Sequence, residues 1–210
     1  MRKNVIDLFF HELDRALQKR ARVIVTGAAA GSLYGNIRPS ADIDFEIRVA
    51  RRRGSRNEAN MAELIGEASS KAGLAVNYSD DIGHWSMIDY LDYRKTSKRY
   101  KSFGRLDVRL IAPDYWTIGK MARSMKLDID DMVAVIRKQR LSANRLIALW
   151  ARALRASPLS LDKGRFARNV ENFLRGYGKK VWGKKFDTES ALKSFRKRAG
   201  LGPSSTTPQS

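Results

Sequence analysis

The stretch that decides the fold is residues 23–49, which read VIVTGAAAGSLYGNIRPSADIDFEIRV. Its first four residues, together with Arg22 before them, form a β-branched run at 22–26. This run predicts a strand that Gly27 ends. Small residues at 28–34 then predict a short helix. From 42 to 49 apolar and charged residues alternate, which predicts a second strand with one face buried.

Two acids two positions apart project from one face of this second strand. The mutual repulsion of Asp42 and Asp44 is relieved by a cation, and Mg²⁺ (or Mn²⁺) suits their hard oxygen ligands. A third acid on a neighbouring strand would complete a clamp for two metal ions. Asp107, on the alternating strand 105–111, is the candidate, and Glu46 competes with it because it shares the face of the pair.

An Asp-x-Asp pair taken alone favours a solvated strand face. The glycine turn upstream changes this interpretation, because backbone N–H groups at a turn between a strand and a helix can hold a phosphate. Two glycine pairs compete for this role. Gly27-Ala28 fits the strand-turn context better, whereas Gly31-Ser32 offers a hydroxyl group.

The combination has a family resemblance. A strand, Gly27-Ala28, a thirteen-residue spacer and Asp42-Ile-Asp44 together resemble the signature of the polymerase-β-type nucleotidyltransferase superfamily. Within it, Gly35-Asn-Ile-Arg38-Pro-Ser40-Ala and the acid pair resemble the uncharacterised bacterial branch related to AbiEii-type toxins.

A second block supports this branch and extends the resemblance over roughly residues 23–136. Pro113-Asp114 leads to Lys120, and Asp128 and Asp131 follow at the spacing of the branch's conserved network. Ordinary helix capping and surface pairing explain the same residues equally well.

The resemblance implies a metal-dependent enzyme that moves a nucleotidyl group from an NTP to a protein or an RNA such as tRNA. Asp42 and Asp44 would hold two Mg²⁺ ions, and Asp107 would complete the catalytic metal site. The residues assigned to nucleotide binding are Gly27, Ala28, Ser32, Arg38, Ser40 and Lys120. The branch also implies a toxin role, with an antitoxin protein as partner. The alternative is a basic nucleic-acid-binding protein of the same fold with little or no catalytic activity.

Positive charge is concentrated in the last third of the chain. The net charge is +19, and residues 132–200 carry 18 Lys and Arg against four acids. Such a field attracts nucleic acid. Lys179, Lys180, Lys184 and Lys185 flank Trp182, and we expect these lysines to be exposed and to bind RNA. We expect the aromatic rings of this region, by contrast, to be buried.

Composition excludes several classes of protein. The chain has no cysteine and two histidines, so thiolate catalysis and sites of several histidines are excluded. No stretch approaches the ~20 apolar residues of a membrane span, so we expect no membrane contact. Residues 1–21 lack the apolar core of a signal peptide, and we expect a cytoplasmic protein.

The order of elements predicts an α+β fold, with a small mixed sheet flanked by helices and a helical C-terminal part. We expect a core domain at 1–113, a helical basic region at 114–200 and a disordered tail at 201–210. The other predicted elements are a strand at 74–78 and helices at 4–19, 55–71 (opened by a capping box, Ser55 to Glu58), 114–125, 128–140, 142–156, 163–177 and 188–199. Asp114, Asp128, Ser142 and Asp187 are the predicted N-caps of four of these helices. Residues 79–102 carry no clear pattern.

Overall fold

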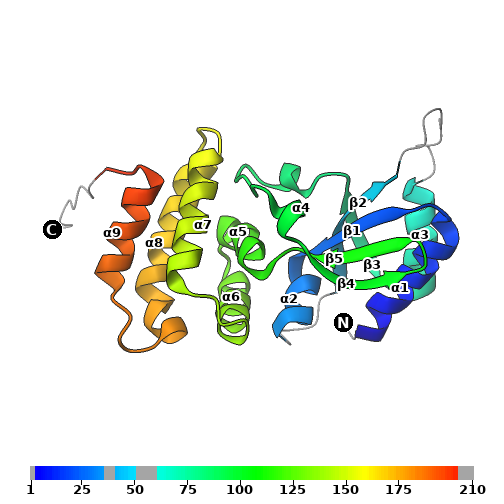
Figure 1. The fold of residues 1–210 in the computed structure, drawn as a ribbon, viewed down its shortest axis with the longest axis horizontal. Coiled ribbons are helices and arrows are strands. Elements are labelled where there is room, and N and C mark those ends of the chain that lie inside the picture. The colour runs from blue at the N-terminus through cyan, green and yellow to red at the C-terminus, as the bar shows by residue number, and fades with distance from the viewer. Residues whose placement is uncertain (1–2, 36–40, 51–60, 203–210) are drawn as a thin grey trace. The chain divides into compact units, whose positions relative to one another are not determined.

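The computed structural model describes residues 3–35, 41–50 and 61–202, which divide into two compact units (Figure 1). Among the described residues, the first unit comprises 3–35, 41–50, 61–85 and 92–116, and the second comprises 86–91 and 117–202. A mixed sheet flanked by helices, followed by C-terminal helices, confirms the predicted α+β class. None of the described helices is both long and apolar enough to cross a membrane.

The first unit is built on a five-stranded sheet of order β3-β2-β1-β5-β4 within the described residues. Its elements are α1 (Lys3–Leu17), β1 (Ala21–Thr26), α2 (Gly27–Gly35), β2 (Asp42–Val49), α3 (Met61–Ala72), β3 (Ala75–Ser79), the 3₁₀ turn η1 (Ile82–Trp85), α4 (Tyr93–Thr96), β4 (Lys98–Phe103) and β5 (Leu106–Leu110). Strand β1 lies antiparallel to β2 and parallel to β5. Strand β2 is parallel to β3, and β4 is antiparallel to β5.

The alternation in β2 separates a core face from a polar face, as predicted. Ile43, Phe45 and Ile47 are buried on the first face. The ring of Phe45 packs against Phe9 and Phe10 of α1, with centroids 5.6 and 6.2 Å apart. Helix α1, which also packs against α3, therefore covers the apolar face of the sheet. The charged residues of β2 lie on the opposite face.

Helix α5 (Pro113–Arg123) spans the point where the units divide, and the rest of the second unit is helical. Its described helices are α6 (Lys126–Lys138), α7 (Ala143–Ala156), α8 (Leu161–Trp182) and α9 (Thr188–Ala199). The last three lie side by side in Figure 1 and contact one another. The side chains packed between these helices are apolar, and they include the fully buried Trp150, Phe166, Phe173 and Phe195.

Helix boundaries test the capping predictions one by one. Ser142 and Asp187 cap α7 and α9 through their side chains, as predicted. The caps predicted at Asp114 and Asp128 are wrong, because α5 begins at Pro113 and α6 at Lys126. Proline suits the first position of a helix, since its missing N–H has no partner there in any case. Both aspartates therefore lie inside the first turn.

Three elements within 79–102, namely η1, α4 and β4, have no counterpart in the sequence prediction. Helix α8 is longer than the predicted 163–177, because it continues through Gly178 to Trp182. At Gly178 a side chain would lie only 2.3 Å from the ring of Phe186. The predicted capping box at Ser55 to Glu58 lies outside the described residues, as does the tail beyond Gly202.

Candidate functional site

The glycine turn and the acid pair meet at the point where β1 passes into α2. Gly27 has a φ of +61°, a conformation that glycine adopts far more readily than other residues. A Cβ built at Gly27 would lie 1.9 Å from Oδ2 of Asp44. The indole N–H of Trp116 donates a hydrogen bond to the carbonyl oxygen of Gly27, 2.7 Å away. The carboxylate of Asp44 therefore lies directly against a fixed backbone turn at the start of a helix.

Asn77 of β3 joins the two carboxylates of the pair. The parallel register places Asn77 beside Asp44, on the neighbouring strand. Its Nδ2 donates to Oδ2 of Asp42 at 3.1 Å and to Oδ1 of Asp44 at 3.0 Å. A neutral amide thus occupies the position next to the pair and offsets part of its repulsion.

Sequence reasoning missed Asn77 although it predicted the strand. Asn77 lies within the predicted strand 74–78, but no sequence pattern shows which strand is its neighbour or in which register. The pairing of β2 with β3 supplies that information.

Asp107 does not join the acid pair, which corrects the predicted third carboxylate. Asp107 lies opposite Arg22 at the start of β1, whereas Asp44 lies opposite Thr26 at its end. Four residues of strand correspond to about 13 Å at roughly 3.3 Å per residue, before the width of the sheet is added. Asp107 instead pairs with Arg22 at 3.2 Å and with Arg109 at 3.6 Å.

Glu46, the competing third carboxylate, is an internal counter-ion. Its side chain is 1% exposed, and Arg94 binds both of its oxygens, at 2.7 and 2.9 Å. The hydroxyl of Tyr93 donates to Glu46 as well, and Arg48 lies 3.2 Å away. Burial, followed by the hydrogen bond to Glu46, raises the pKa of the Tyr93 hydroxyl. Glu46 is therefore enclosed by its own partners rather than turned towards the acid pair.

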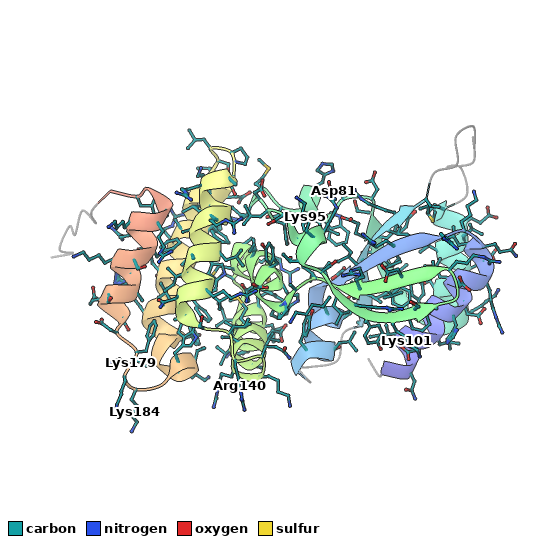
Figure 2. All side chains as sticks on the ribbon, viewed as in Figure 1. Asp81, Lys95, Lys101, Arg140, Lys179 and Lys184 are labelled. Carbon is teal, nitrogen blue, oxygen red and sulfur yellow. The ribbon has the colours of Figure 1, made fainter. Side chains whose placement is uncertain are left out.

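Asp81, labelled in Figure 2, completes this ionic cluster through Arg94, whose Nη2 lies 2.7 Å from Oδ1 of Asp81. Burial raises the pKa of Asp81, but hydrogen bonds from Arg94 and from the N–H of Gly83 outweigh it and hold the pKa below its usual value. The cluster fixes the chain around α4 against the polar face of β2.

The position of Gly31-Ser32 answers the question left open between the two glycine pairs. Both residues lie inside α2, and the hydroxyl of Ser32 donates to the carbonyl oxygen of Ala29 at 2.8 Å. Gly27-Ala28 is thus the pair at the turn between strand and helix. Arg38 and Ser40, the remaining predicted ligands near the pair, lie outside the described residues.

Lys120 lies in the second unit and forms the network that the resemblance suggested. Its side chain is 2% exposed, and its ammonium group lies 3.0 Å from Oδ1 of Asp128 and 2.7 Å from Oδ2 of Asp131. Arg123 also binds Asp128, at 2.8 Å. Although burial raises the pKa of Asp128, hydrogen bonds from Arg123 and Lys120 hold it below its usual value. The nucleotide-binding role of Lys120 stays a prediction.

The four lysines predicted to bind nucleic acid are exposed, near the turn between α8 and α9. Figure 2 shows Lys179 and Lys184 pointing away from the ribbon there. Trp182 is half-buried, and its N–H donates to the carbonyl oxygen of Leu141 at 2.9 Å while its ring packs on Phe186 at 4.9 Å. Phe195 is fully buried. The aromatic rings thus support the fold, as expected, and leave the charges outside.

Comparison of the chain with protein families, with curated proteins and with solved structures found no match. The site must therefore be judged on its own donor atoms. No three His, Cys, Asp or Glu side chains converge within 3–35, 41–50 and 61–202. Two carboxylates and one amide nevertheless form a set of oxygen donors that suits Mg²⁺, provided that Asn77 turns its Oδ1 towards the ion.

Proposed function

We propose that the chain is a metal-dependent nucleotidyltransferase, which moves a nucleotidyl group from an NTP to a protein or an RNA such as tRNA. The observation that carries the proposal is the contact between Gly27 and Asp44, where only glycine leaves room for the carboxylate. This contact supports a site in which a phosphate-holding turn and a metal-holding acid act on the same substrate.

Each described residue of the site has a role that follows from its position. Asp42 and Asp44 present hard oxygen ligands on one face of the sheet, and Asn77 beside them would add its Oδ1 once the amide turns. A bound Mg²⁺ would neutralise charge on the phosphates during transfer. Helix α2 has nine residues and starts at Gly27, so its first N–H groups offer donors to a phosphate. Asp107 is not available as a third ligand, and none of the described acids replaces it.

One observation favours a second candidate function, a nucleic-acid-binding protein of this fold with little activity. The residue beside the acid pair is the neutral Asn77, and the described residues supply no third carboxylate of the kind that a two-metal clamp requires. Two carboxylates with an amide hold one ion more readily than two, because each additional divalent ion needs compensating negative charge.

Incubation with each labelled NTP, Mg²⁺ or Mn²⁺, and total RNA tests the proposal. We expect label to appear on RNA or on protein, and to be lost in Asp44→Asn. Asp107→Asn is the matched control, because it removes the same charge from the same face of the sheet but away from the pair. Loss of transfer in both variants would show that the site is wrongly placed. Absence of transfer in the wild type with every NTP would favour the second candidate.

The toxin role with an antitoxin partner is part of the same proposal and has its own test. We expect expression of the wild type to arrest growth and Asp44→Asn to relieve the arrest. Growth arrest that persists in Asp44→Asn would separate any toxicity from nucleotidyl transfer.

A further inference from the structure

A groove between α8 and α9 on the second unit is lined mainly by cationic side chains. It encloses about 320 Å³. The cations are Arg175 from α8 and Lys193, Arg196 and Lys197 from α9. Leu201 supplies apolar surface, and Glu189 is the one carboxylate that the described residues contribute to the lining. The groove is separate from the exposed lysines at the turn between the two helices.

The walls of the groove are held in place by an ion pair between its helices. Nε and Nη2 of Arg196 lie 2.9 and 3.0 Å from the two oxygens of Glu171 on α8. Paired planar contacts of this kind fix geometry as well as charge. Leu192 and Phe195 are buried on the inner side of α9. The groove is therefore a fixed feature of the packed helices rather than a gap between side chains.

The remaining cations of the groove have their charges available for a ligand. Arg175, Lys193 and Lys197 are exposed and form no ion pair within the described part of the chain. Lys193 and Lys197 stand four residues apart on α9, where like charges repel across one helical turn. Neighbouring cations of this kind favour an anionic ligand.

We propose that the α8–α9 groove binds the backbone of single-stranded RNA, with phosphates on the cations and ribose against Leu201. A groove of about 320 Å³ is too small to enclose a duplex, so the proposal is restricted to a single strand. Glu189 argues for RNA over DNA. A carboxylate repels phosphates, but it accepts a hydrogen bond from the ribose 2′-hydroxyl, which DNA lacks.

This binding goes beyond the proposed enzyme activity and needs neither metal nor NTP, so the two can fail separately. The probe is a labelled single-stranded RNA of about 12 nucleotides, within the site sizes of single-strand binders, titrated by anisotropy at several salt concentrations without divalent ions. The groove variant is Arg175→Ala with Lys193→Ala and Lys197→Ala. The control variant removes three exposed cations of the first unit, Lys19, Lys95 and Lys98.

We expect the groove variant to raise Kd at least tenfold and to reduce the salt slope by about two, because each phosphate that a cation neutralises on a single strand adds roughly 0.7 to that slope. The control variant should change Kd by no more than about twofold, because none of its three residues lines the groove. We also expect RNA to bind more tightly than DNA of the same sequence, and Glu189→Ala to remove that difference.

Two results would overturn binding of RNA in the groove, and a third would overturn the role of Glu189. Equal losses of affinity in the groove and control variants would mean that binding reflects total charge alone. Competition by poly-glutamate as strong as that by unlabelled RNA of equal charge would identify the groove as a surface for an acidic protein. A preference for RNA that persists in Glu189→Ala would remove the hydroxyl contact from the account.

Discussion

Replacing Gly27 by alanine should disturb the acid pair as well as strain the backbone. An L-residue at a φ of +61° costs about 1–2 kcal/mol in any setting. At Gly27 the added Cβ also lies 1.9 Å from Oδ2 of Asp44, whereas an ordinary contact begins at 3.4 Å. The carboxylate must move away, which breaks its 3.0 Å hydrogen bond with Asn77, at about 1 kcal/mol.

Gly73 provides the matched control, because it has a φ of +60° and open space around its Cβ position. Urea unfolding should therefore show Gly73→Ala destabilised by about 1–2 kcal/mol, and Gly27→Ala by about 1 kcal/mol more. A Mn²⁺ titration should show at least tenfold weaker binding in Gly27→Ala alone, which corresponds to about 1.4 kcal/mol. Equal unfolding free energies in the two variants, with unchanged metal binding, would refute the contact between Gly27 and Asp44.

Three further predictions follow from the described contacts. Asn77→Asp should lower the unfolding free energy in the absence of metal, because a third carboxylate then joins the pair. When Mg²⁺ is added, the unfolding free energy of this variant should rise more than that of the wild type. Equal increases in the two proteins would argue against a metal at this site. Lys120→Met should destabilise the second unit by about 3–5 kcal/mol, measured by urea unfolding, because it removes the buried cation that two buried carboxylates share, although Asp128 keeps its pair with Arg123. A decrease below about 1 kcal/mol would contradict the burial of this network. The pKa of Asp128 is held low in the folded chain, so ionised Asp128 stabilises the fold fully above the unfolded pKa of about 3.9. This stabilisation is lost as the pH falls through the lower folded pKa. Asp128→Asn should therefore flatten the acid side of a plot of unfolding free energy against pH, and a plot identical to that of the wild type would exclude this linkage.

Local patterns in the sequence predicted the elements around the site well. The alternation of 42–49 predicted β2 and the buried face of Phe45, and Gly27 marked the end of β1. Helix caps at Ser142 and Asp187 followed from residue type, because their side chains bond neighbouring backbone groups. These features depend on contacts within a few residues, which is why the sequence contains them.

Register was the information that the sequence lacked. Alternation showed correctly that Asp107 shares a face with Asp44, but a face says nothing about position along the strand. In the structure the residue next to the acid pair is therefore Asn77 and not the predicted Asp107. Glu46 was misjudged for a similar reason, since Arg94 and Tyr93 come from the part of the chain, 79–102, for which no element was predicted.

The most direct test of the central claim is a Mn²⁺ titration of the wild type, Asp44→Asn and Asp107→Asn, followed by electron paramagnetic resonance of the free ion. We expect one Mn²⁺ ion to bind at the pair of Asp42 and Asp44. This binding should be lost in Asp44→Asn and retained in Asp107→Asn. Binding that survives Asp44→Asn, or that disappears in Asp107→Asn, would contradict this expectation.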